Sequence, residues 1–245
     1  MNRLIFTHPI LFFFLLLSGH IAYAQECVVL LHGLGRSTWS MHHIENSLEK
    51  IGYLVVNQSY LSREQSIQSL SEVVGDSILR CQQHKPSAIH FVTHSLGGIL
   101  VRSYFQHHDA ANVKRVVMLG PPNHGSEVVD KFKDSWWFKW LTGPTGQELG
   151  TNPESAPNQL KPIILEIGII AGSSSLDPWF SSLFSGDNDG KVSVESTKLP
   201  EMKDFIQVEN SHTFMANSRN VIMQIQSFLS SGAFAKPNRA LISSN

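Results

Sequence analysis

The chain has 245 residues, of which 42% are hydrophobic and 16% are charged, and its formal net charge is −1 at neutral pH. This size and composition are ordinary for one globular domain with a sizeable core. The 19 basic and 20 acidic residues nearly balance, so the charge suggests no nucleic-acid partner, and the composition indicates no particular oligomeric state.

Residues 1–24 have the pattern of a secretory signal peptide. Arg3 precedes an apolar run over residues 4–17, and Ala22-Tyr23-Ala24 resembles a cleavage site before Gln25. The run is shorter than the ~20 apolar residues that a membrane span needs. We therefore expect removal of this segment and a secreted or periplasmic mature protein; the alternative is an uncleaved N-terminal membrane anchor.

Strand and helix signals alternate along the rest of the chain. Apolar runs predict strands over residues 27–31, 53–56, 89–94, 113–119, 162–171 and 205–208. Apolar residues at helical spacing predict helices between Met41 and Ile51, between Ile67 and Cys81, after Ser95, and over 214–229. Continuous apolar strands separated by helices indicate an α/β fold, with a mostly parallel sheet of about six strands covered on both faces.

The pattern predicts one domain over residues 25–235. Within it, the loop-rich stretch 120–161 is expected to form a lid-like or cap-like insertion over the sheet. Residues 236–245 are expected to form a flexible C-terminal tail.

Ser95 stands where the strand from Ile89 runs directly into a helix. A serine nucleophile on such a sharp turn needs small neighbours two positions before and after it, because strand and helix approach each other there. Gly97 meets this need, whereas Thr93 takes the position where the usual pattern has Gly. The stretch predicts a nucleophile elbow; the alternative is a tight turn that contains a serine.

The segment His32-Gly33-Leu34-Gly35 follows the first mature strand. A tetrahedral intermediate needs two backbone N–H donors aimed at its oxyanion. One would come from Leu96, directly after the elbow serine, and the other from the glycine-containing loop at Leu34. The alternative is a simple glycine-rich turn.

An acid and a base follow Ser95 in the order Asp, then His. His212 lies between the last strand and the last helix, and no other histidine follows His124. For the acid, Asp189 in the Asn-Asp-Gly turn is favoured, with Asp187 and Asp177 as alternatives.

The chain has two cysteines, Cys27 at the start of the first strand and Cys81 at the end of a helix. In a parallel α/β sheet, both positions lie at the same edge. The spacing leaves two outcomes open, a disulfide or two buried free thiols.

Taken together, HGLG, THSLGG, GPPNHGSE, NDGKVSVES and SHTFM resemble the lipase and esterase relatives of the α/β-hydrolase fold, in particular bacterial triacylglycerol lipases. The resemblance covers most of the chain from Cys27 to Leu229. It implies that Asp189 is the triad acid. It also implies that the helix ending at Cys81 crosses the first strand, which favours the disulfide.

The resemblance implies a serine hydrolase that cleaves carboxylic esters of hydrophobic acyl groups. Ser95 would be the nucleophile, His212 the base and Asp189 the residue that orients it, with Leu34 and Leu96 forming the oxyanion hole. This chemistry needs no metal and no organic cofactor. The alternatives are a thioesterase, an amidase or an acyltransferase with the same triad, or a non-catalytic binding protein. Transient contact with a membrane or lipid surface fits a hydrophobic substrate.

One further pattern lies in the insertion. Trp136, Trp137, Trp140 and Leu141 fall on one side of a helical wheel. They predict either a lid that contacts the acyl chain or a helix packed on the domain.

Overall fold

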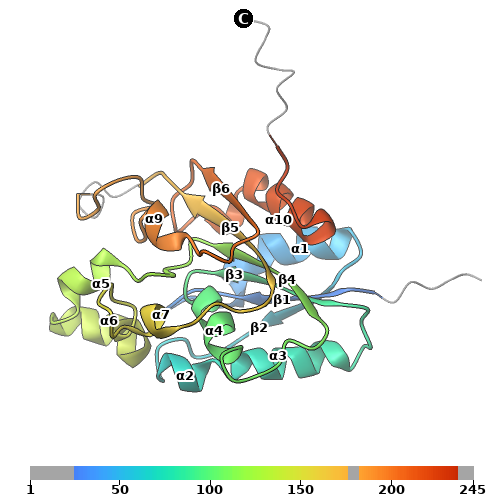
Figure 1. The fold of residues 1–245 in the computed structure, drawn as a ribbon, viewed down its shortest axis with the longest axis horizontal. Helices are drawn as coiled ribbons and strands as arrows, with labels where there is room; N and C mark the ends of the chain where they lie inside the picture. Colours follow the sequence, from blue (N-terminus) through green and yellow to red (C-terminus); the bar gives the residue numbers. More distant parts are fainter. Residues whose placement is uncertain (1–24, 176–181, 237–245) are drawn as a thin grey trace, which may run out of the picture.

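The computed structural model describes residues 25–175 and 182–236 (Figure 1). Six strands form one parallel sheet in the order β2-β1-β3-β4-β5-β6. They are β1 (Cys27–Leu31), β2 (Leu54–Gln58), β3 (Ile89–His94), β4 (Val113–Leu119), β5 (Glu166–Gly172) and β6 (Asp204–Val208). The segment 1–24 and the tail from residue 237 onward lie outside the described residues, as does Asp177.

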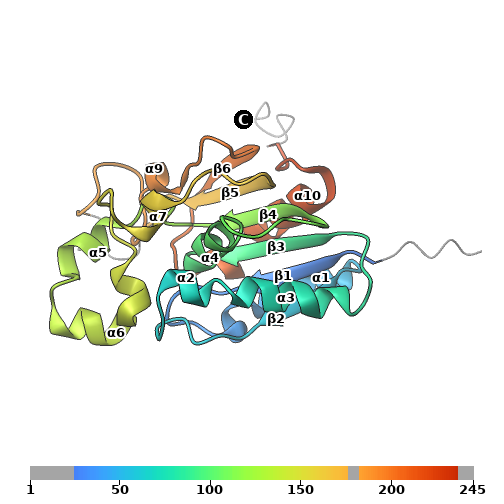
Figure 2. The same cartoon turned by 60° about the horizontal axis from the view of Figure 1, so that its bottom comes forward.

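Helices cover both faces of the sheet, as Figures 1 and 2 show. They are η1 (Thr38–Met41), α1 (His42–Lys50), α2 (Ile67–Leu70), α3 (Val73–Gln82), α4 (Leu96–Tyr104), α5 (Glu127–Phe132), α6 (Trp136–Gln147), α7 (Ala156–Gln159), α9 (Val194–Thr197), η2 (Met215–Asn217) and α10 (Arg219–Ser231). None of the helices in the described part of the chain combines the length and the apolar character that crossing a bilayer requires.

The core consists of two apolar layers separated by the sheet. From β1, Val28 and Leu30 pack with side chains of α1 and α10, whereas Val29 and Leu31 pack on the other face with side chains of α2, α3 and α4. Because both faces are covered, β1 is apolar throughout its length and completely buried. The predicted fold class is therefore confirmed.

The strand order changes direction between β1 and β3. The chain leaves β1 for β2 on one side and then crosses back to β3 on the other. At such a point the loops that follow the two strands diverge and leave a crevice at the carboxyl edge of the sheet. Figure 2 shows α5 and α6 standing beyond this edge. The loop with Leu34 and the turn at Ser95 both open into this crevice.

Several predicted elements differ in extent from those in the structure, and β2 and β6 differ by one or two residues at their ends. The helix expected between Ile67 and Cys81 is two helices, because the hydroxyl of Ser71 donates to the Gln68 carbonyl and competes with the helical backbone bonds. Strand β5 begins at Glu166 rather than residue 162. The last helix is divided into η2 and α10, which begins only after Ser218.

The stretch 120–161 was expected to be rich in loops, but it contains α5, α6 and α7. Its helices are short, and α6 is interrupted at Gly143, whose φ of 60° lies in the left-handed region, just before Pro144. A Cβ atom at Gly143 would lie 1.9 Å from the carbonyl oxygen of Arg63, so only glycine allows this close approach between α6 and the loop after β2.

Cys27 and Cys81 form a disulfide that ties the start of β1 to the end of α3. The two residues are 54 positions apart. A cross-link of this span removes many conformations from the unfolded chain.

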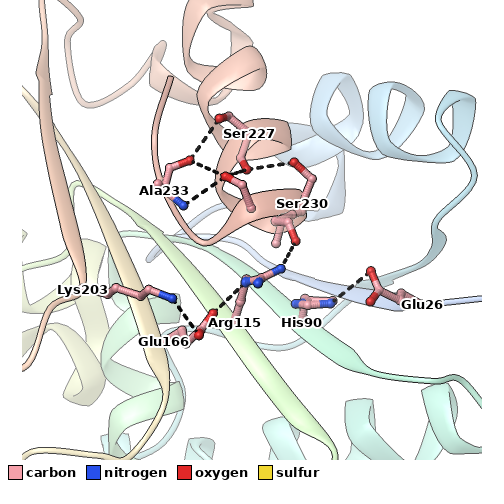
Figure 3. Close-up of polar contacts among 10 residues, drawn as sticks. Glu26, His90, Arg115, Glu166, Lys203, Ser227, Ser230 and Ala233 are labelled. Carbon is pink, nitrogen blue, oxygen red and sulfur yellow. Dashed lines mark hydrogen bonds and ion pairs between the residues drawn. The ribbon is translucent and has the colours of Figure 1, made fainter. Parts of the chain in front are cut away.

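A polar cluster ties the amino edge of the sheet to the last helix (Figure 3). Arg115 donates to Glu166 at 2.7 Å and to the carbonyl of Leu229 at 2.6 Å, and Lys203 donates to the second oxygen of Glu166 at 2.7 Å. Beside this cluster, the completely buried ring of His90 lies 3.4 Å from the carboxylate of Glu26. Burial lowers the pKa of His90 to about 4, although Glu26 opposes the shift.

The disulfide should contribute about 4 kcal/mol to the free energy of unfolding, as estimated from the entropy of closing its loop. Reduction should therefore lower the melting temperature by roughly 8–16 °C. Thermal unfolding followed by circular dichroism, with and without a reductant, measures this shift. The double variant Cys27→Ala/Cys81→Ala should show no response to the reductant. Equal melting temperatures for the oxidised and reduced wild type would contradict the prediction.

Acid should destabilise the fold through His90. Between about pH 6.5 and pH 4 the unfolded chain binds a proton at this residue and the folded chain does not, so the free energy of unfolding falls as the pH falls. The contribution is complete above about pH 6.5, and its loss amounts to roughly 3 kcal/mol by pH 4. Urea unfolding across this range should show a flatter pH dependence for His90→Gln. The exposed His84→Gln is the matched control, and an unchanged slope in His90→Gln would refute the assignment.

Candidate active site

The turn between β3 and α4 presents Ser95 at the carboxyl edge of the sheet. Its φ of 53° and ψ of −118° form a backbone conformation that residues with a side chain rarely adopt. The backbone N–H of Ser95 donates to the Leu119 carbonyl at 2.9 Å, which ties the strained turn to β4. Ser95 lines a cavity that opens at this edge.

The need for a small residue after the serine has a direct structural cause. A Cβ atom at Gly97 would lie 2.6 Å from the carbonyl oxygen of Leu31, because α4 leaves the turn directly against β1. On the other side of the serine, Thr93 is completely buried in β3, and its hydroxyl oxygen would be 3.3 Å from a Cβ at Gly98. Gly98 has no side chain, which leaves room for the Thr93 hydroxyl at the position where the usual pattern has glycine.

His212 and Asp189 meet at the carboxyl edge, although 23 residues separate them. The Nδ1 of His212 donates to the Oδ2 of Asp189 at 2.7 Å, and both side chains are almost completely buried. The other carboxylate oxygen accepts the backbone N–H groups of Lys191 and Val192 at 3.0 and 2.8 Å. These bonds hold the carboxylate at the Nδ1 side of the imidazole ring.

The alternative acid Asp187 is directed elsewhere. It accepts a hydrogen bond of 2.7 Å from the exposed side chain of Gln207. Asp187 and the buried Asp189 are two positions apart in the sequence, yet of the two only Asp189 contacts His212. Asp177 lies outside the described residues.

The loop after β1 is held by residues that sequence reasoning did not identify. The Tyr60 ring stacks on His32 with centroids 4.1 Å apart, and the Tyr60 hydroxyl donates to the His32 carbonyl. The N–H of Gly35 donates to the hydroxyl of Ser62 at 2.9 Å. Between these two anchors, Leu34 lines the same cavity as Ser95.

His94 is a second buried histidine at the site. Its Nε2 donates to the backbone carbonyl of His212 at 3.0 Å, and the two rings lie 4.8 Å apart. Burial holds the pKa of His94 well below its usual value, and the His212 ring lowers it further, whereas the hydrogen bond to the His212 backbone opposes the shift. A neutral His94 therefore keeps Nε2 protonated as the donor that supports the loop of His212. Its position next to Ser95 was the only sequence signal for this role.

The cavity has a volume of about 410 Å³, within the range of ~300–1,000 Å³ that is usual for small-molecule sites. One wall is apolar and comes largely from the insertion: Val128, Val129, Phe132, Trp137, Phe138, Leu141 and Leu149. The tryptophans of α6 divide into two groups. Trp137 lines the cavity, whereas the side chains of Trp136 and Trp140 are 80% and 78% exposed.

Both ends of the insertion are attached to the helix that follows Ser95. The buried guanidinium of Arg102 on α4 donates to the Asn123 backbone and side-chain oxygens, at 3.1 and 3.2 Å, and to the Leu160 carbonyl at 3.1 Å. Burial lowers the pKa of Arg102 to about 10, which still leaves it charged at neutral pH, and Glu201 opposes the shift. A single arginine within an apolar helix is the sequence signal that could have identified this anchor.

The close approach at Gly97 predicts a contrast between two adjacent glycines. Gly97→Ala should cost about 2–3 kcal/mol of unfolding free energy, because the new methyl group meets the backbone of β1. Gly98→Ala meets side-chain atoms at 3.3 Å and gains helix propensity, so its effect should stay below about 1 kcal/mol. Urea unfolding of both variants measures the difference. Equal losses of stability would be inconsistent with this geometry.

Solved structures similar to this chain share its fold. The mature lipase BlEst2 of Bacillus licheniformis aligns with a TM-score of 0.71 at 20% identity, covering 85% of this chain and 92% of that one. The metagenomic carboxyl esterase MGS0156 aligns with a TM-score of 0.60 at 17% identity, covering 77% of this chain and 65% of that one. Identities this low support the shared α/β-hydrolase fold alone.

Sequence comparison adds a family. The lysosomal thioesterase PPT2 of Rattus norvegicus is 24% identical over 119 residues, which cover 46% of this chain and 38% of that protein. PPT2 of Mus musculus matches to the same extent. The aligned part is thus well under half the length of these relatives. The model of the palmitoyl protein thioesterase family matches residues 27–157, just over half of the 245 residues. The chain therefore belongs to the palmitoyl protein thioesterase family, on an α/β-hydrolase fold.

Proposed function

We propose that this chain is a serine hydrolase that cleaves esters of hydrophobic acyl groups, thioesters included. The observation that carries this proposal is the 2.7 Å hydrogen bond between His212 and Asp189, beside a cavity that also contains Ser95. Membership of the palmitoyl protein thioesterase family supports the thioester as a substrate.

In the proposed reaction, Asp189 holds the Nδ1–H of His212, which leaves Nε2 to accept the proton of the Ser95 hydroxyl. The serine oxygen bonds to the acyl carbon, and the backbone N–H groups of Leu34 and Leu96 stabilise the resulting oxyanion. The bond to the leaving thiol or alcohol then breaks as His212 returns the proton to it. Water repeats the cycle on the acyl-enzyme, and the carboxylic acid leaves.

The insertion would act as the wall that receives the acyl chain. Phe132, Trp137 and Phe138 come from α5 and α6 and line the cavity beside the catalytic residues. Burial of apolar surface favours binding by roughly 25 cal/mol per Å², so a longer chain should bind more tightly until the wall is covered. The exposed Trp136 and Trp140 would make transient contact with a lipid surface.

We further propose that the protein is secreted or periplasmic, with residues 1–24 as a cleavable signal peptide. The disulfide between Cys27 and Cys81 supports an oxidising compartment. The relative PPT2 is described as lysosomal, and the lysosome is also outside the cytosol.

The catalytic assignment predicts a sharp difference between two neighbouring aspartates. Asp189→Asn should lower kcat about 10³–10⁴-fold, because the amide favours the wrong imidazole tautomer. Asp187→Asn is the matched control and should change kcat less than about twofold, since it contacts Gln207 instead. Ser95→Ala should abolish turnover.

Hydrolysis of p-nitrophenyl esters and of acyl thioesters from acetyl to palmitoyl provides the measurement. We expect kcat/KM to rise with chain length in both series. Activity that survives Ser95→Ala would remove the proposed nucleophile. A folded wild type that cleaves neither series would favour an amidase or a binding protein, and transfer of the acyl group to an added alcohol in preference to water would indicate an acyltransferase.

A further inference from the structure

Three cationic side chains line the cavity together with the apolar wall. Arg36 follows the Leu34 loop, Arg63 follows β2, and Lys191 lies two residues after Asp189. Among the described residues that line the cavity, none is a carboxylate. The polar side of the cavity is therefore positive.

In the described part of the chain, no carboxylate forms an ion pair with these three cations. Within residues 25–175 and 182–236, neither Arg36 nor Lys191 takes part in an ion pair, whereas Arg115, Lys198 and Lys203 each have a carboxylate partner. Arg63 donates to the uncharged carbonyl of Leu141 at 3.0 Å. The carboxylate of Asp189 is already engaged by His212 and two backbone N–H groups.

Arg36 and Lys191 act on the same small region. The side chain of Lys191 reaches solvent, yet the protein around it desolvates the ammonium and lowers its pKa; the Arg36 charge lowers it further, and Asp189 opposes both. Arg36 and Lys191 also help to lower the pKa of His94 beside Ser95. Like charges held together in a partly desolvated site repel each other, and an anion would relieve that repulsion.

We propose that Arg36, Arg63 and Lys191 form an anion subsite for a phosphate on the leaving group of the substrate. The acyl chain would bind against the apolar wall. The cations would then face the leaving group, which should carry the negative charge. This inference rests on the proposed hydrolase function and specifies its substrate class. The phosphate could belong to a phosphorylated thiol carrier or to a glycerophosphate, and the two sources present the same chemistry to the cations.

Two substrate pairs isolate the contribution of the phosphate. The thioester pair is S-decanoyl-4′-phosphopantetheine and S-decanoylpantetheine; the oxygen-ester pair is decanoylglycerol phosphate and decanoylglycerol. The members of each pair differ by one phosphate group. The measured quantity is the ratio of kcat/KM within a pair, which cancels any general change in catalysis. The pair with the larger ratio identifies the source of the phosphate.

For the wild type, we expect a ratio of about ten or more in at least one pair at low ionic strength, falling several-fold when salt is raised from about 0.05 M to about 0.5 M. Arg36→Gln/Lys191→Gln should lower that ratio about tenfold, and the charge-preserving Arg36→Lys/Lys191→Arg should restore most of it. The matched control is Lys50→Gln/Lys85→Gln, which removes two exposed charges at the opposite edge of the sheet and should keep the wild-type ratio.

The outcomes separate the subsite from the hydrolase. Equal kcat/KM within both pairs would overturn the subsite, as would a kcat/KM ratio that persists in Arg36→Gln/Lys191→Gln. In either case, turnover that depends on Ser95 would still support the hydrolase. Absence of turnover on all four compounds, or turnover that survives Ser95→Ala, would overturn both.

Discussion

The backbone reversal at Ser95 is the constraint on which the rest of the site depends. A hydroxyl can stand at the end of a buried strand only where the chain turns sharply enough to leave it exposed. That turn drives α4 back against β1, so close that a Cβ at Gly97 would lie 2.6 Å from a backbone oxygen. The same approach brings the loop after β1 beside the serine. The positions of the proposed nucleophile and of both proposed oxyanion donors thus follow from one turn at the point where the strand order reverses.

The parts of the fold that sequence reasoning predicted well are those governed by burial. Strand β1 has the predicted bounds, because a strand covered on both faces must be apolar along its length. Strand β4 also has them, and its last five residues are buried. Elements with mixed surroundings were predicted less well. The helix before Cys81 breaks where a serine hydroxyl competes for a backbone carbonyl, and apolar spacing does not report that competition.

The candidate site divides in the same way. His212 was predicted as the base because no other histidine follows His124 in the sequence. The Asn-Asp-Gly turn favoured Asp189 over Asp187, and the resemblance strengthened that preference. In the folded chain, backbone N–H donors and His212 surround Asp189, whereas Asp187 contacts Gln207. His94 and Tyr60 were missed because their partners are backbone carbonyls far away in sequence, which no local pattern encodes.

The helical wheel of α6 illustrates a different limit. It grouped Trp136, Trp137, Trp140 and Leu141 on one side. Of these, Trp137 and Leu141 line the cavity, whereas Trp136 and Trp140 are exposed. Periodicity describes a helix in isolation. Which side chains line a cavity depends on how the helix packs on its neighbours, and here Gly143 and Leu141 bring α6 against the loop at Arg63.

The guanidinium of Arg102 ties the helix that carries Ser95 to the segment that forms the apolar wall of the cavity. It lies on the helix that begins at Ser95 and holds Asn123 and Leu160, the two stems of the insertion, at hydrogen-bond distance. A shift of α4 should therefore move the Ser95 turn and the apolar wall together and preserve the distance between them. Because Arg102 holds both ends of residues 120–161, we expect entry and exit of a bulky molecule to involve deformation within α5 and α6.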